Sequence, residues 1–208
     1  MHPHDCGNAP NAVPGTKSGT ATTPPDYQTT ARDGASSHVI TKGRPVYLGL
    51  VPPDSDDGTL QNSTATGDNL TGTNDEDGIV RKNLPTILTN MTSVKMNVTA
   101  ANGTTNLALL ACWIDFDRNG QFGDTASEIA SAVVPPGTLP GTVFPPTFSG
   151  FPTPLTAGPT ALRCRISTDA TWKATVAPIG VAGSIGPASD GEVEDYMVNG
   201  IYDPCNTS

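Results

Sequence analysis

Carboxylate side chains gather at four places in this 208-residue chain, and these clusters contain 14 of its 20 Asp and Glu residues. The clusters are Asp54/Asp56/Asp57, Asp68 with Asp75/Glu76/Asp77, Asp115/Asp117/Asp124, and Asp190/Glu192/Glu194/Asp195. Carboxylates packed this closely repel one another unless a cation or a set of hydrogen-bond donors stabilises them. Only 11 Lys and Arg are available, and few are adjacent to the clusters. A hard divalent cation, most simply calcium, is therefore the expected partner.

The most regular cluster directly follows an apolar run at residues 107–114. Oxygen-bearing side chains stand at alternate positions, and Gly120 at the sixth position permits a tight turn. This spacing predicts a calcium loop with five ligands: Asp115, Asp117, Asn119, Gln121 (through its carbonyl) and Asp124. It is not an EF-hand, because position 12 is Ala126 and the loop is entered from a predicted strand. A metal-free turn rich in Asp and Asn uses the same residue types and is the alternative.

A second ion site is predicted in the long acidic segment 51–78, which has no hydrophobic periodicity. Loops of this length are usually functional or disordered, and a bound ion would supply the missing order. The predicted ligands are Asp75, Glu76 and Asp77, together with Asp68.

The last cluster lies in Gly191-Glu192-Val193-Glu194-Asp195-Tyr196. On a strand, Asp195 faces one side and Glu192 and Glu194 face the other, so either register puts an acid beside core residues. A buried carboxylate needs a partner. Arg163 and Arg165 are candidates for an ion pair and a cation is the other candidate, and the sequence does not distinguish them.

The elements that position these residues are predicted to be short strands. Gly (22 residues) and Pro (20 residues) interrupt nearly every window, and Thr and Val favour strands over helices. The strongest strand signals are the apolar run 107–114 and the alternating segment 162–166. We expect an all-β protein, an antiparallel β-sandwich of immunoglobulin-like or jelly-roll type, over residues 38–208.

Residues 1–37 are predicted to form an extended N-terminal arm, because they are poor in apolar residues and rich in Thr, Ala, Gly and Pro. Such an arm becomes ordered only by docking on its own domain or on a neighbouring molecule. Strand donation to a neighbour would make the chain a homopolymer. An arm that folds back on its own sandwich is the alternative.

The charge balance excludes some partners. A net charge of −9 and a pI near 4.5 argue against nucleic acids and anionic membrane surfaces. No run of residues is long and apolar enough to span a bilayer. The first residues lack the pattern of a signal peptide, so we expect the chain to be the mature form of a secreted protein or to lack its leader.

Several motifs together resemble the GEVED domain of bacterial secreted and cell-surface proteins. The resemblance is carried by Gly191–Tyr196, by the W-I-D-F-D-R-N-G segment that begins at Trp113, and by four shorter upstream matches between residues 33 and 78. Asp117 and Asn119 exchange the family's usual Asn and Asp, which keeps oxygen ligands. The resemblance covers roughly residues 33–202. It implies an extracellular β-sandwich module with no established catalytic role.

The four cysteines are too far apart for a zinc or redox motif, and their even number suits two disulfides in an oxidising compartment. Cys112 and Cys164, which are outside the family pattern, are predicted to pair because they share inward parity on the two most buried strands. Cys6 and Cys205 would then join the two ends of the chain. Buried free thiols are the alternative.

We therefore expect a secreted, non-enzymatic, calcium-stabilised subunit of a cell-surface filament. A monomeric adhesin module that binds a glycan or a protein is the alternative, with Tyr27, Trp172 and Tyr202 as the aromatic residues outside the core strands. Enzymatic motifs such as G-x-S-x-G, a P-loop or H-E-x-x-H are absent from the sequence. A glycosylated surface is suggested by Asn-x-Ser/Thr sequons at Asn62, Asn69, Asn90, Asn97, Asn102 and Asn206.

Overall fold

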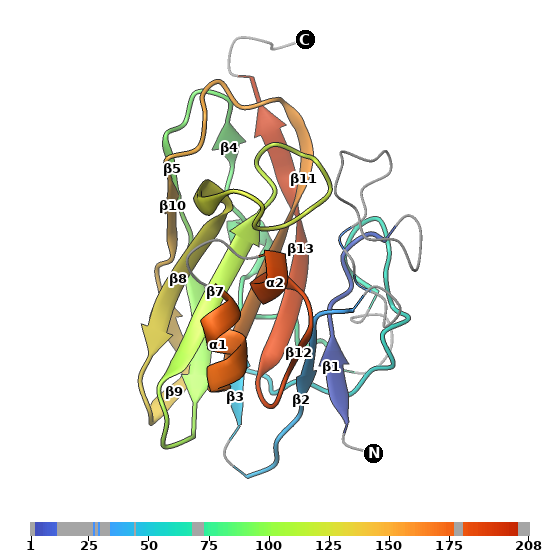
Figure 1. The fold of residues 1–208 in the computed structure, drawn as a ribbon, viewed down its shortest axis with the longest axis vertical. Coiled ribbons are helices and arrows are strands. Elements are labelled where there is room, and N and C mark those ends of the chain that lie inside the picture. The colour runs from blue at the N-terminus through green and yellow to red at the C-terminus, as the bar shows by residue number, and fades with distance from the viewer. Residues whose placement is uncertain are drawn as a thin grey trace.

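A computed structural model describes residues 3–11, 27, 29, 34–43, 45–67, 73–176 and 181–203 (Figure 1). The strands in these ranges are β1 (His4–Cys6), β2 (Ser37–Val39), β3 (Val46–Leu48), β4 (Ile87–Leu88), β5 (Ser93–Lys95), β6 (Val98–Asn102), β7 (Ala108–Ile114), β8 (Ile129–Val134), β9 (Thr138–Phe144), β10 (Thr147–Ser149), β11 (Gly158–Ser167), β12 (Pro187–Ala188) and β13 (Glu192–Tyr202). The helical elements are the 3-10 turns η3 (Arg81–Asn83) and η4 (Ala126–Glu128) and the α-helices α1 (Ala170–Val176) and α2 (Val181–Ser184).

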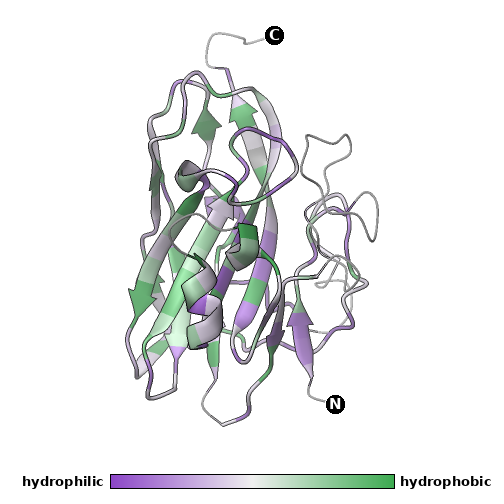
Figure 2. Cartoon of the chain, in the orientation of Figure 1, coloured by the Kyte–Doolittle hydropathy of each residue, from purple (hydrophilic) through white to green (hydrophobic). Residues whose placement is uncertain are grey.

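The largest sheet has the strand order β4-β13-β11-β7-β8. Its central strands β7, β11 and β13 pair antiparallel, whereas the short edge strand β4 runs parallel to β13. Both faces of β7 and β11 are buried, which explains why residues 107–114 read as a nearly continuous apolar run. Figure 2 shows a mostly hydrophobic sheet with hydrophilic residues at the start of β13.

A second sheet packs against one face of the first. Its strands β3, β6 and β9 are hydrogen-bonded in that order, and β5 and β10 form a separate pair. Met96 N–H donates to the carbonyl of Pro146, so β5–β6 and β9–β10 form one long antiparallel pairing that is interrupted at Pro145 and Pro146. Val94, Met96 and Val98 face the main core between the sheets. The prediction of an all-β sandwich is confirmed.

The opposite face of the large sheet is covered by a third layer. Helices α1 and α2 lie in front of β7, β11 and β13, and β12 and β2 lie beside the start of β13 (Figure 1). A second apolar cluster fills this interface, including Trp113, Phe122 and Trp172. The sequence did not predict α1. Asp169 stabilises its first turn by accepting hydrogen bonds from the N–H groups of Thr171 and Trp172.

The described part of the N-terminal arm docks on the same molecule. β1 pairs antiparallel with β2, which begins inside the predicted arm at Ser37, and Cys6 lies opposite Ser37 in the register. Ala9, Tyr27 and Thr29 are buried. Within one molecule, the arm therefore takes the fold-back arrangement that the sequence left as the alternative.

The predicted disulfide between Cys112 and Cys164 is confirmed, with a Cα–Cα distance of 4.1 Å. The two residues lie directly opposite each other on β7 and β11 and face the main core. For this pair the free-thiol alternative is wrong. Cys6 has no disulfide partner among the described residues, and Cys205 lies outside them.

In the described ranges, no helix is long and apolar enough to cross a membrane.

Candidate calcium site in the loop after strand β7

The loop after β7 has the tight turn that its sequence predicts. Asp115 is the first residue after the strand, and Gly120 adopts a φ of +83°, a left-handed conformation that favours glycine. Arg118 is also left-handed, with a φ of +61°. Its guanidinium donates to the carbonyls of Ala157 and Pro159, which anchors the loop to the start of β11.

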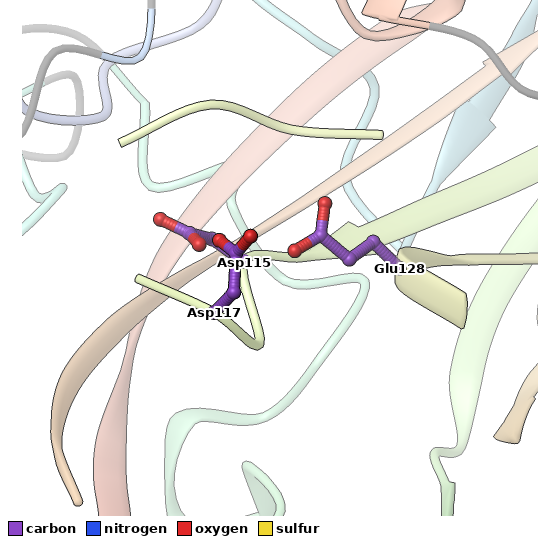
Figure 3. A group of neighbouring side chains, drawn as sticks. All are labelled: Asp115, Asp117 and Glu128. Atoms are coloured by element: carbon purple, nitrogen blue, oxygen red, sulfur yellow. The ribbon is translucent and has the colours of Figure 1, made fainter. Parts of the chain in front are cut away.

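Three carboxylates converge in this loop. One ligand oxygen from each of Asp115, Asp117 and Glu128 lies within 4.8 Å of the others (Figure 3). Asp115 and Asp117 come from the turn, whereas Glu128 approaches from η4, at the start of β8. Asp115 and Glu128 are fully buried. Calcium takes about six to eight oxygen ligands, and carboxylates that converge from two sides of a small space can supply part of that set.

Backbone N–H groups fix the two buried carboxylates. Asp115 Oδ1 accepts from Asn119 N–H at 3.1 Å, and its Oδ2 accepts from Gly120 N–H at 2.9 Å. Glu128 Oε1 accepts from Phe116 N–H at 3.0 Å, and its Oε2 accepts from Gly123 N–H at 3.1 Å. These bonds orient the groups. Each carboxylate oxygen has two lone pairs, and Tyr27 O–H takes the second lone pair of Asp115 Oδ2, so acceptor capacity for a cation is left at Asp115 Oδ1 and at both oxygens of Glu128.

The structure brings the other predicted ligands into the same turn. Asn119 donates its side-chain amide to both Asp117 and Asp124, and its Oδ1 accepts from Gln121 N–H at 2.9 Å. Asp124 Oδ1 is buried and has no hydrogen-bond partner among the described residues. Buried acceptors are normally satisfied, so this oxygen is suited to a ligand.

Burial and mutual repulsion make these carboxyl groups resist ionisation. Burial raises the pKa of Asp115 to about 6. The pKa of Glu128 is raised to about 10, mainly by burial and then by the contact with Asp124 and the negative charges of Asp115 and Asp117. The two ion pairs of the described residues, Arg81–Glu76 and Arg163–Asp195, involve neither group. A divalent cation would therefore supply the missing positive charge.

Sequence reasoning missed Glu128. In an EF-hand the last ligand is at position 12 of the loop, where this chain has Ala126. Here the last acid, Glu128, comes two residues later. The signal that could have found it is that Glu128 is the last acid before the apolar strand β8.

The second predicted ion site is not assembled in the described residues. Asp75 Oδ2 accepts from Asp54 N–H at 2.6 Å, and Asp77 Oδ1 accepts from Leu50 N–H at 2.9 Å. Glu76 forms an ion pair with Arg81 at 3.2 Å. Each carboxylate thus binds a different segment, and Asp68 lies outside the described residues.

The acids of residues 191–196 connect distant segments to β13. Glu194 Oε1 accepts from the N–H groups of Asp77 and Gly78, both at 2.9 Å, and its Oε2 accepts from Tyr196 O–H at 2.7 Å. Glu192 accepts from Leu48 N–H. Burial raises the pKa of both glutamates, that of Glu194 to about 8. These contacts give the two glutamates a structural role.

On the opposite face of β13, the ion-pair interpretation is confirmed for Asp195. Arg163 donates to both of its carboxylate oxygens, at 2.7 and 2.8 Å, and both side chains are fully buried. Arg165 instead donates to the carbonyls of Gly183, Ile185 and Gly186 and to His38 Nε2. The two arginines therefore connect the large sheet to the layer that covers it.

Two further expectations change. Trp172 and Tyr27 are buried, so of the three aromatic residues proposed for a glycan platform only Tyr202 is exposed, at 48%. Asn102 is fully buried and its side chain donates to the carbonyls of Asn106 and Val134, so this sequon is closed to glycosylation in the folded chain. Asn69 and Asn206 lie outside the described residues.

The fold and site define an all-β sandwich in which a loop of convergent acids follows one central strand and an acidic segment begins another. The family model of the GEVED domain matches residues 109–199, from β7 to β13, which includes the loop and the Gly191–Tyr196 segment. The predicted GEVED domain is thus confirmed over these residues, and the match does not extend to the upstream motifs between residues 33 and 78. No curated protein and no solved structure matches the chain.

Proposed function

We propose that this protein is a non-enzymatic, calcium-stabilised structural protein of the cell exterior that assembles into filaments by exchanging its N-terminal arm. Calcium is supported by the convergence of Asp115, Asp117 and Glu128. An exterior location is supported by the buried disulfide, since disulfides persist in oxidising compartments.

The observation that carries the assembly proposal is the way in which the arm docks. β1 contributes only a three-residue strand to the chain's own β2 and is joined to it by 30 intervening residues, 7–36. An extended segment of that length spans roughly 100 Å at about 3.3 Å per residue. The same strand can therefore pair with β2 of its own molecule or of a neighbour, which is the basis of domain-swapped polymers.

A non-enzymatic role is favoured by the chemistry of the most reactive residues in the described part. A groove of about 720 Å³ beside β1 is lined by Cys6, His4 and Asp56, among others. A nucleophilic thiol needs a lowered pKa. Burial and the nearby charges of Asp56 and Asp5 instead raise the pKa of Cys6 far above its usual value. This thiol is therefore unsuited to catalysis.

Arm exchange is tested with Ser37→Cys. Ser37 lies opposite Cys6, which has no disulfide partner in the described part of the chain, and both line the groove, so the introduced thiol should form a disulfide with Cys6. Purified protein is allowed to assemble and is then oxidised. On a non-reducing gel, arm exchange predicts a ladder of covalent oligomers. Negative-stain imaging should show filaments, and oxidation of the variant as a dilute monomer beforehand should prevent them.

The matched control for this experiment is Ser149→Cys, which introduces a thiol on β10, away from β1. It should form filaments and give no ladder. If Ser37→Cys yields only internally oxidised monomers, and images show separate particles, arm exchange is wrong.

A monomeric adhesive module is the second candidate function. It is favoured by exposed apolar side chains, since Leu50, Leu139 and Val143 are each more than half exposed on or beside β9. Separate particles in the imaging experiment would favour this candidate, and a protein ligand would then be sought.

A further inference from the structure

We infer that Tyr27 couples the candidate calcium site to docking of the N-terminal arm, so that calcium regulates whether the arm is available to a neighbour. This inference rests on the proposed function and adds a regulatory link to it. Tyr27 would act as a positioning residue, because it contacts a ligand of the site rather than the ion.

Tyr27 makes two contacts with the calcium loop. Its hydroxyl donates to Asp115 Oδ2 at 2.9 Å. Its ring stacks on Phe122, with centroids 4.5 Å apart and an interplanar angle of 24°. Only 3% of Tyr27 is exposed, so this arm residue is part of the interior on that side of the loop.

Tyr27 is also fastened to the part of the arm that leads into β1. Its N–H donates to the carbonyl of Pro10 at 3.0 Å, and Thr29 Oγ1 donates to the carbonyl of Ala9 at 2.9 Å. Ala9 N–H in turn donates to Asp195 at 2.8 Å. A continuous set of contacts therefore links Asp115 to residues 9–10 and so to the strand that would be exchanged.

Coupling follows from the shared residues. A cation bound by Asp115 and Glu128 would hold the loop in one conformation, and so would fix both surfaces that Tyr27 contacts, the Asp115 carboxylate and the Phe122 ring. The seated Tyr27 would orient the same carboxylate for the cation. Because coupling between two binding events is reciprocal, calcium should favour the docked arm and the docked arm should favour calcium.

The test uses the full chain and its Tyr27→Phe variant. This change removes the hydroxyl and keeps the ring that stacks on Phe122, so folding should be preserved. We expect calcium affinity, measured by titration calorimetry, to fall by about 3- to 10-fold, which corresponds to the net contribution of one ordinary hydrogen bond. Tyr202→Phe, at the exposed end of β13, is the matched control and should leave the affinity unchanged.

Hydrogen exchange of the wild type supplies a second measurement that does not depend on a variant. Calcium should slow exchange of the amides of residues 4–9, and Tyr27→Phe should reduce that slowing. If calcium binds, but Tyr27→Phe has the wild-type affinity and calcium does not slow exchange of residues 4–9, the coupling is overturned and the calcium site stands. If the wild type binds no calcium, the proposed calcium role fails and the inference fails with it.

Discussion

Replacing Glu128 by Gln is expected to abolish the stabilisation of this protein by calcium. Glu128 is one of the three carboxylates that converge in the loop, it is fully buried, and it approaches from the side opposite the turn. At a free calcium concentration 100 times the dissociation constant, binding to the native state adds about 2.7 kcal/mol to the free energy of unfolding. That increment, measured by denaturant unfolding with calcium and with a chelator, should be close to zero in Glu128→Gln.

Asp57→Asn is the matched control, because Asp57 is an exposed acid that caps its own turn through Thr59 N–H. It should keep the full calcium increment. An equal increment in wild type and Glu128→Gln would show that the loop is a metal-free turn.

The pH dependence in chelator gives an independent check of the same carboxyl group. The pKa of Glu128 is raised to about 10, so the folded, ion-free protein binds more protons than the unfolded chain between about pH 4.5 and pH 10. Its contribution to stability is present below pH 4.5 and is lost as the pH rises through this window. Glu128→Gln should therefore flatten the decline. Calcium should oppose the decline, because a cation favours the ionised carboxylate.

The sequence predicted the parts of the fold that depend on local pattern. The alternation at Leu162, Cys164 and Ile166 placed these residues on one face of a strand, and the same parity for Cys112 gave the disulfide. The Asp and Gly spacing after residue 114 located the acidic loop. Each of these signals spans about ten residues, over which strand periodicity and turn chemistry are decisive.

The contacts that the sequence did not predict are those between distant segments. Glu128 joins Asp115 only because η4 returns to the loop, and Tyr27 reaches Asp115 across 88 positions of sequence. The sequence left a cation and an ion pair as equal alternatives for the acids of residues 191–196, because it cannot show that Leu48, Asp77 and Gly78 present their N–H groups to the two glutamates. A carboxylate that is buried for structural reasons and one that binds a metal are the same residue types in a sequence. Only the hydrogen-bond donors around the folded side chain distinguish them.

Replacing Arg163 by Met is expected to destabilise the fold by about 3–5 kcal/mol, because it would leave Asp195 as an uncompensated buried charge. Arg163 donates twice to Asp195 and once each to the carbonyls of Ser184 and Tyr27, and no part of its side chain is exposed. Its guanidinium also lies 5.2 Å from the centre of the Phe122 ring. Urea unfolding of the variant, with calcium held constant, measures the loss.

The chain offers a matched control and a rescue for this prediction. Arg81→Met removes the second ion pair of the described residues, in which the arginine side chain is 36% and the glutamate side chain 5% exposed, and should cost less than Arg163→Met because one partner is open to solvent. Adding Asp195→Leu to Arg163→Met should recover part of the loss, because an apolar pair avoids the cost of burying an unpaired charge. Two results would contradict the prediction: a loss of unfolding free energy in Arg163→Met no larger than that in Arg81→Met, or a double variant less stable than Arg163→Met. Either would show that the Arg163–Asp195 pair does not hold the covering layer on the sheet. In the expected case, the Asp of the Gly191–Tyr196 segment has a definite role: it pairs with the arginine that joins β11 to α2 and to the arm.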